Sequence, residues 1–440
     1  RFGVSLLANL GLADACCAPT DEAYVEKACA LAADTAALAL LRRTLRARLA
    51  ASPVMDAARY MAHLEAAYEK IWAHWLGEDT AKARKLLVPK LEKEADEAFA
   101  ARDFRRFLAL AARLAALDAA SAQLFVRMGF AALQLEEAAR ARLYLERALE
   151  EVQAEKPEVL QLLAEAQKLV GDHKAARASL QQAEALTEAR AETRAFRCRL
   201  ALAHAHAAYM LGLADEAAAS YLAAADLAED VRGESEAYSS YLLALHGTQS
   251  GTEELFRAHQ GYEKLLAGLR PLAACALQHR EKIRIGYLSP DFRRHVMFSF
   301  IYGLFVRFDR ARFEVYAYSL SEEKDGFTEA LRAQATVWRE AAGLSYEEIA
   351  AQIRADEVDV LVDLAGHSAG GALPVLAYRP APVQVSGLGY VNTTGLSAVD
   401  YFLTDDIVDP PAHDAFFTEE PVCLTSQFLY TAKSEVPEPA

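Results

Sequence analysis

The residues best suited to chemistry lie in the last third of the chain, around two histidines. The first, His295, follows the segment KIRIGYL, in which apolar side chains alternate with polar or small ones before Ser289-Pro290-Asp291 break the pattern. The alternation predicts a strand, the break predicts a turn, and the apolar spacing from Arg293 predicts a helix. A neutral imidazole near the first turn of that helix could take or give a proton near pH 7, although a surface or capping histidine gives the same local pattern.

The second histidine, His367, lies in the segment VDVLVDLAGHSAGG and is followed directly by Ser368. The neighbouring glycines Gly366, Gly370 and Gly371 would let the backbone approach a ligand closely. Ligands of open α/β sheets bind outside the carboxyl ends of the strands. Both histidines are therefore predicted at the same edge of a sheet, and a buried structural histidine remains the alternative for His367.

Five motifs in a fixed order resemble the amino-terminal catalytic lobe of protein O-linked N-acetylglucosamine transferases. They are SPDFRRH, DLAGHSAGG, LAYRPAPVQVSGLGY, TTG and DYFLTD, within residues 282–432. That family joins tetratricopeptide repeats to a two-lobed glycosyltransferase of the B type. The resemblance implies an α-helical tetratricopeptide-like solenoid followed by a Rossmann-like α/β lobe. It also implies an inverting transfer of N-acetylglucosamine or another hexose from a nucleotide sugar to Ser or Thr of a protein.

The resemblance also implies roles for particular residues. His295 matches a histidine of the family's active site, which makes it the candidate catalytic residue, and His367 matches a cleft position. The candidate substrate-binding residues are His367, Ser368, Leu388, Gly389, Tyr390, Thr393 and Thr394. The sequence departs from the family at Gly387, where tryptophan is common, and at Val391-Asn392, where Pro-Gly is common. These departures leave the identity of the sugar open.

The expected donor is a nucleotide sugar, with UDP as the expected nucleotide, and no cofactor or obligatory metal is expected. In B-type transferases the second lobe holds most of the nucleotide. No DxD-like pair stands in a convincing context here, and no G-x-G-x-x-G follows Tyr287. The sequence therefore predicts neither a metal site nor a dinucleotide fingerprint.

Residues 78–235 read as tetratricopeptide-like repeats because small and large residues recur at a fixed spacing. Ala141 and Ala176 are equivalent positions 35 residues apart, whereas the next equivalent, Ala217, lies 41 residues further on and implies a lengthened turn or helix. Such repeats must stack to bury their apolar faces. They could form a groove for an acceptor protein or peptide, or they could act as a rigid spacer.

The remaining segments are predicted to be mostly helical. Residues 1–76 resemble the carboxyl end of the same transferase domain, so either a tandem array of modules has been cut across or the domain is circularly permuted. Residues 236–280 resemble the helical linker before the catalytic lobe at 281–432, and 433–440 form a tail. Two linker histidines, His246 and His259, are interpreted as structural.

Composition argues against nucleic acid as the main partner and against a membrane span. The net charge of −15 disfavours nucleic acid, whose binding depends on basic residues. Six cysteines without a CxxC spacing fit a reducing cytoplasm, and no apolar run approaches the roughly 18 residues of a membrane span. We therefore expect a cytoplasmic protein O-glycosyltransferase, present as a fragment without its nucleotide-binding lobe and inactive alone. A non-catalytic scaffold that binds proteins through its repeats is the alternative.

Overall fold

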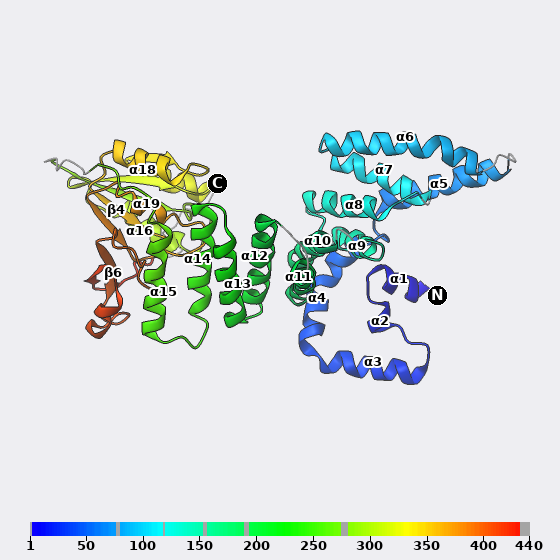
Figure 1. Ribbon diagram of the computed structural model, residues 1–440, viewed down its shortest axis with the longest axis horizontal. Coiled ribbons are helices and arrows are strands. Elements are labelled where there is room, and N and C mark those ends of the chain that lie inside the picture. The colour runs from blue at the N-terminus through cyan, green and yellow to red at the C-terminus, as the bar shows by residue number, and fades with distance from the viewer. Residues whose placement is uncertain are drawn as a thin grey trace. The chain divides into compact units, whose positions relative to one another are not determined.

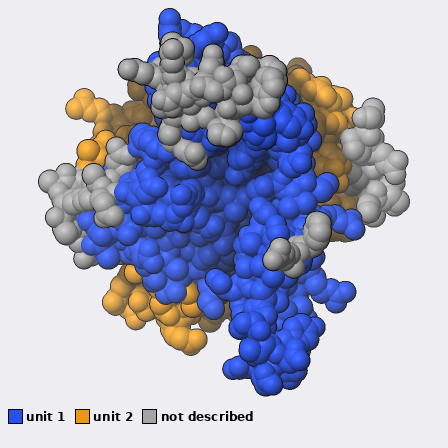
Figure 2. Space-filling view, turned by 90° about the vertical axis from the view of Figure 1, so that its right-hand side faces the viewer, with its two compact units in different colours: residues 1–192, 206–211 blue, residues 193–205, 212–440 orange. Residues whose placement is uncertain are grey.

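The computed structural model describes residues 2–75, 80–117, 119–152, 156–188, 193–273 and 280–431. The chain forms two compact units, coloured separately in Figure 2. The first comprises residues 1–192 and 206–211, and the second comprises 193–205 and 212–440. All strands of the described residues lie in the second unit, beyond residue 280.

The first unit opens with the helices α1 (Phe2–Asn9), α2 (Ala13–Cys16), α3 (Asp21–Ala33), α4 (Thr35–Ala51) and α5 (Ala57–Trp75). Thr20 and Asp34 are the N-caps of α3 and α4, and their side-chain oxygens accept hydrogen bonds from backbone N–H groups of the first turn. Helix α4 packs against α9, and α5 packs against α7. Large apolar side chains nevertheless stay exposed on these helices, among them Tyr60 and Ile71 at 62% and 64%.

The repeats of the first unit are α6 (Thr80–Ala100), α7 (Phe104–Ala116), α8 (Ala122–Gln134), α9 (Ala138–Leu149), α10 (Lys156–Leu169) and α11 (His173–Glu188). Successive helices pack against one another in the stack that Figure 1 shows. Ala141 and Ala176 are buried at helix contacts, and a Cβ on Gly129 would lie 2.5 Å from Cγ of Leu145. The predicted spacing of small residues is thus the spacing of close helix packing.

Four more helices precede the sheet: α12 (Arg194–Met210), α13 (Ala214–Leu227), α14 (Val231–Leu245) and α15 (Thr252–Leu265). The 17 residues of α12, against 14 in α10, agree with the lengthening that the 41-residue spacing predicts. Within the second unit, α13 packs on α14 and α14 on α15.

The second unit contains a seven-stranded sheet in the order β3-β2-β1-β4-β5-β6-β7. The strands are β1 (Ile283–Ser289), β2 (Phe313–Ser319), β3 (Val337–Glu340), β4 (Val360–Asp363), β5 (Val383–Ser386), β6 (Tyr401–Asp405) and β7 (Glu420–Leu424). Every neighbouring pair is parallel, which confirms the Rossmann-like α/β fold. The strand order reverses between β1 and β4, so the ligand-binding crevice of such a sheet is expected there.

Helices cover both faces of this sheet, as buried strands of a parallel sheet require. The intervening helices are α16 (Phe298–Val306), α17 (Gly326–Arg332), α18 (Tyr346–Ala355), α19 (Pro374–Ala377) and the 3-10 helix η1 (Pro411–Phe416). One core joins α16 and α17 to the sheet, and another joins α14, α15, α18 and α19 to it. Leu242 of α14 and Tyr262 of α15 belong to that second core, so the predicted linker is a structural part of the lobe. None of the described helices has the length and apolar composition needed to cross a membrane.

Candidate active site

The loop after β1 carries His295. The helix predicted from Arg293 begins only at Phe298, so His295 lies in the loop, three residues before the helix. The backbone N–H of Arg294 donates a hydrogen bond to Asp325 Oδ2 at 2.7 Å. This bond ties the loop after β1 to the loop that carries Asp325. His295 is therefore held at the rim of the sheet, with its side chain 36% exposed.

Asp291 lies beside this imidazole. Its Oδ1 is 3.3 Å from Nδ1 of His295, and the backbone N–H of Met297 lies 3.4 Å from the same nitrogen. Nδ1 either donates to the carboxylate or accepts from Met297, so the two contacts correspond to different tautomers. Burial raises the pKa of Asp291, and the charges of His295 and Arg293 act in the opposite direction. An ionised Asp291 favours the tautomer with a proton on Nδ1, which leaves Nε2 free to accept a proton.

His367 follows β4 and is 1% exposed. Its Nε2 lies 2.9 Å from the carbonyl oxygen of Thr394, and its Nδ1 lies 2.9 Å from Oγ of Ser239 on α14. Burial, together with the neighbouring His259, holds the pKa of His367 well below its ordinary value. A neutral ring that donates from Nε2 and accepts at Nδ1 satisfies both contacts. In this state His367 positions the surrounding loops and has no free nitrogen for a ligand.

The loops after β4 and β5 are locked together by Ser368 and Gly389. Ser368 Oγ donates to the carbonyl oxygen of Gly389 at 2.9 Å. A Cβ on Gly389 would lie 1.9 Å from the carbonyl oxygen of Leu364, so only glycine fits there. Leu388, the preceding residue, is half-buried against the core that includes α16.

Tyr390 is held by two histidines of the preceding helices. Its hydroxyl lies 3.0 Å from Nε2 of His246 and 2.9 Å from Nε2 of His259. Nδ1 of His259 is 2.6 Å from the carbonyl oxygen of Leu255, so it donates there and Nε2 accepts from the tyrosine. Burial lowers the pKa of His259 to about 4 and lowers the pKa of His246 as well. The interpretation of both linker histidines as structural agrees with these contacts.

Thr393 and Thr394 point into the lobe. Both hydroxyl groups donate to the buried carboxylate of Glu419, at 2.6 Å for Thr393, and the N–H of Thr394 donates to it at 2.7 Å. Gly395 has a φ of 71°, and a Cβ there would lie 2.0 Å from the carbonyl oxygen of His259. The side chains of both threonines therefore shape the loop from inside, and a ligand would meet the backbone of this segment.

The structure brings the two histidine-bearing loops to the same point of the sheet. A Cβ on Gly370 would lie 3.1 Å from Cβ of Pro290, which places the loop after β4 against the loop after β1. Beside the β4 loop is a pocket with a volume of about 220 Å³. It is lined by Ser235, Glu236, Ser239 and Ser240 of α14, Tyr262 of α15, Tyr346, residues 366–371 and Leu373.

Several residues of the site were not predicted from the sequence. Asp363 ends β4, is fully buried, and accepts hydrogen bonds from the N–H of Gly366 at 2.7 Å and from Oγ of Ser386 at 2.9 Å. Burial raises its pKa. The polar end of the apolar strand VLVD is a signal that could have identified Asp363. Nothing local marks Ser239 or Glu419, because their partners are far away in the sequence. Among the described residues, no three His, Cys, Asp or Glu side chains are grouped as metal ligands.

Residues 272–435 match the family model described as glycosyl transferase family 41. The probable UDP-N-acetylglucosamine–peptide N-acetylglucosaminyltransferase SPINDLY of Arabidopsis thaliana is 37% identical over 203 residues, covering 44% of this chain and 22% of that protein. The UDP-N-acetylglucosamine–peptide N-acetylglucosaminyltransferase of Caenorhabditis elegans is 31% identical over 156 residues, covering 35% of this chain and 14% of that protein.

A solved structure, a variant of the Thermobaculum terrenum O-GlcNAc transferase, is similar with a TM-score of 0.56 at 28% identity, covering 71% of this chain and 59% of that chain. The chain spans 22% of the length of its Arabidopsis relative. The family match begins before β1 and ends beyond β7, so it includes the whole sheet and both histidine loops. The α/β lobe, which follows a tetratricopeptide-like solenoid, matches the glycosyl transferase family 41 model and is similar to the O-GlcNAc transferases.

Proposed function

We propose that this chain supplies the acceptor-binding repeats and one wall of the catalytic cleft of an inverting protein O-glycosyltransferase. The enzyme would transfer N-acetylglucosamine or another hexose from a nucleotide sugar, with UDP as the expected nucleotide, to Ser or Thr of a protein in the cytoplasm. One observation carries the proposal: the loops with His295 and His367 meet where the strand order reverses, inside the segment that matches family 41. Crevices at this position bind ligands in open α/β sheets.

His295 would act as the general base. Its Nε2 would take the proton of the acceptor hydroxyl while the acceptor oxygen forms a bond to the anomeric carbon. The bond from that carbon to the phosphate oxygen breaks in the same step, and the electron pair leaves with the nucleotide. A single displacement of this kind inverts the configuration of the sugar. Asp291, 3.3 Å from Nδ1, would orient the ring and stabilise the imidazolium that forms.

The backbone of residues 388–395 would form the wall that faces the sugar. Supporting this role, Gly389 and Gly395 lie so close to neighbouring carbonyl groups that the segment is fixed in place. A rigid wall positions the anomeric carbon against the acceptor at little entropic cost. Tyr390, held by His246 and His259, would contribute to that rigidity rather than to the chemistry.

The nucleotide's phosphates would be bound by the second lobe of the family's fold, without an obligatory metal. By this proposal the 440-residue chain alone does not transfer sugar. The charge that develops on the leaving phosphate would lack its stabilising donors, and single donors of that kind are each worth about 10²–10³ in rate.

The test compares the 440-residue chain with a longer protein in which the second lobe of a family 41 relative follows it, using UDP-N-acetylglucosamine, UDP-glucose and a Ser/Thr peptide. We expect transfer only by the longer protein. In that protein His295→Ala should lower turnover roughly 10²–10⁴-fold, whereas replacement of His413, exposed on η1, should leave it unchanged.

Equal turnover of the His295→Ala protein would remove this residue from the mechanism. Transfer of sugar by the 440-residue chain alone would contradict the proposal that a second lobe is needed to bind the phosphates. If the longer protein transfers no sugar yet its repeats bind peptides, the non-catalytic scaffold is the correct function.

A further inference from the structure

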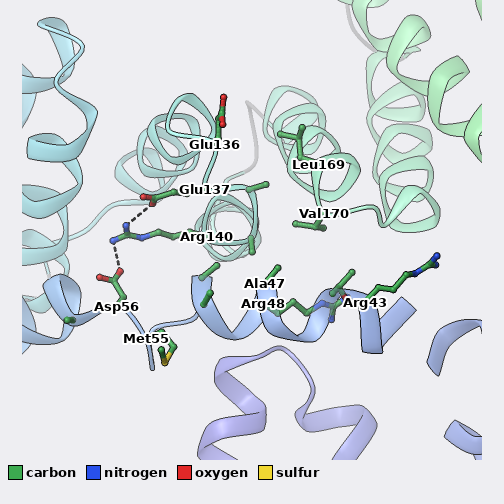
Figure 3. A pocket seen from close by; sticks show the side chains of 16 residues that line it. Arg43, Ala47, Arg48, Met55, Asp56, Glu136, Glu137, Arg140, Leu169 and Val170 are labelled. Atoms are coloured by element: carbon green, nitrogen blue, oxygen red, sulfur yellow. Dashed lines mark hydrogen bonds and ion pairs between the residues drawn. The ribbon is translucent and has the colours of Figure 1, made fainter. Parts of the chain in front are cut away.

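The first unit contains a pocket far in sequence from the α/β lobe. It has a volume of about 680 Å³ and lies between α4 and the turns of two repeats (Figure 3). We call it the α4 pocket. It is lined by Arg43, Thr44, Ala47, Arg48, Ala50, Ala51, Met55, Asp56, Ala57, Glu136, Glu137, Ala138, Ala139, Arg140, Leu169 and Val170. Its size is within the range of ligand-binding sites.

The walls of the α4 pocket are largely apolar, and the charged side chains on its α4 side are positive. Alanines of α4 and α9, with Met55, Leu169 and Val170, supply the apolar surface. Arg43 and Arg48 enter from α4, and neither makes a hydrogen bond or ion pair with another side chain of the described residues. Two unpaired guanidinium groups beside apolar walls favour a ligand that is both anionic and partly apolar.

At the opposite end of the pocket the arginine side chain is already paired with carboxylates of the chain. Arg140 pairs with Asp56 at 2.6 Å and with Glu137 at 2.8 Å. Glu136 is exposed and points away from Arg43 and Arg48 in Figure 3. An anion is therefore attracted to the α4 side of the pocket, where Arg43 and Arg48 lie.

A buried nitrogen of the Arg48 guanidinium group also lacks a hydrogen-bond acceptor. Its Nε–H is buried and donates to no acceptor among the described residues. Burial lowers the pKa of Arg48, the nearby Arg142 lowers it further, and Asp172 and Glu146 partly offset this. Those two carboxylates already pair with Arg142, at 3.4 and 2.7 Å. A buried donor without an acceptor is costly, so an incoming carboxylate would gain a strong charge-assisted contact.

The pocket continues past Arg48. A second pocket of about 180 Å³ shares Arg48, Ala139 and Val170 with the first and extends to Asn9 and Gly11. Arg48 thus lies in the middle of an elongated groove rather than at the end of a cavity. A chain-like ligand can occupy such a groove on both sides of the guanidinium group, which a small free anion cannot do.

We propose that the α4 pocket binds an extended acidic peptide segment of a partner protein. One carboxylate of the segment pairs with Arg48 and Arg43, and the small or apolar residues beside it lie against the alanine-rich walls. This binding site is separate from the proposed transferase cleft and does not depend on the proposed activity.

The test is fluorescence anisotropy of a labelled peptide that alternates glutamate with alanine and leucine, titrated with the whole chain. A peptide with lysine in place of glutamate is the comparison. We expect saturable binding of the acidic peptide alone, weakened by added salt. Arg48→Gln should weaken it by roughly tenfold or more, since a charge-assisted contact is lost. Arg46→Gln, on the same helix but outside the pocket, is the matched control and should change it less than about twofold.

A second pair of variants tests the shape of the pocket without changing its charge. Ala47→Phe would fill the pocket and should weaken binding, whereas Ala39→Phe on the same helix, away from the pocket, should not. Circular dichroism of each variant confirms that the helices are intact.

Three results would overturn the proposal. They are absence of saturable binding, equal weakening by Arg46→Gln and Arg48→Gln, and competition by free glutamate as effective as by the peptide. The last would show a site for small anions only.

Discussion

Tyr390 shows how a residue of the loop after β5 is held by side chains from other segments. Its hydroxyl joins His246 and His259, and its ring also contacts His367 at a centroid distance of 5.1 Å. The four side chains form one buried cluster between α14, α15 and the loops after β4 and β5. The tyrosine hydroxyl and both ring nitrogens of His259 and of His367 have hydrogen-bond partners, so the loss of one group affects several.

Removal of the hydroxyl group should therefore be costly. Tyr390→Phe leaves a donor on His246 and an acceptor on His259 without a partner, and we expect it to lower the free energy of unfolding by about 1–3 kcal/mol. Urea denaturation measures the change. Tyr287→Phe is the matched control, because Tyr287 is also buried but its hydroxyl makes no hydrogen bond among the described residues. Equal effects of the two substitutions would contradict the importance of the cluster.

The same cluster makes stability depend on pH. The pKa of His259 is about 4 in the folded chain, against an ordinary value of 6.5. Between these values the unfolded chain binds a proton that the folded chain does not, so the free energy of unfolding rises with pH. The stabilisation is complete above pH 6.5 and is lost as the pH falls toward 4. The lowered pKa values of His246 and His367 act in the same direction.

We expect His259 to contribute on the order of 3 kcal/mol to this pH dependence. Urea denaturation at about pH 5 and about pH 7.5 should show a smaller difference in the His259→Gln protein than in the parent. Replacement of His413, an exposed histidine of η1 outside the cluster, is the matched control for the substitution itself. A parent protein equally stable at both pH values would show that these imidazoles are accessible to protons in the folded state.

At the scale of elements, the repeats are held together by small residues at helix contacts. Ala176 is 1% exposed and belongs to the face of α11 that also buries Leu180 and Ala183. Interiors are close-packed, so a contact sized for a methyl group has no room for a larger side chain. The 35-residue spacing between Ala141 and Ala176 arises because each repeat needs a small residue at this contact.

Ala176→Leu should overpack α10 and α11 and destabilise the first unit by about 1–3 kcal/mol. A thermal melt followed by circular dichroism measures it. Ala178→Leu is the matched control, because Ala178 is exposed on the same helix. A melting temperature of the Ala176→Leu protein equal to that of the control would show that the predicted repeat register is wrong.

At the scale of the whole molecule, two units with separate cores share one chain. The core of the repeats includes Phe107, Met128 and Leu145, whereas the cores of the lobe include Tyr262, Leu288 and Phe305. Residues that share one hydrophobic core unfold together. Chains with separate cores therefore commonly unfold in more than one transition.

Calorimetry of the whole chain should accordingly resolve two unfolding transitions. Ala176→Leu should lower the temperature of one, and Tyr390→Phe should lower the temperature of the other. A single transition that both substitutions shift equally would show that the units unfold together.

The sequence by itself determined the fold of the lobe and the order of its parts. Alternating and helical periodicities are local, so the strand at Ile283, the loops with His295 and His367 and the spacing from Ala141 to Ala176 could all be predicted. The ordered motifs also indicated the family. The start of α16 could not be predicted, because apolar residues already occur in the loop before Phe298 and their spacing does not mark where the loop ends and the helix begins.

Only the tertiary structure decided what the candidate site residues contact. His367 and Ser239 are 128 residues apart in the sequence, and Tyr390 is 144 residues from His246 and 131 from His259. Such hydrogen bonds form only when helices α14 and α15 pack against the lobe. The spacing of apolar and polar residues within either segment does not indicate them. For that reason the sequence identified the residues of the loops, whereas their burial, their tautomers and the α4 pocket followed only from the packed molecule.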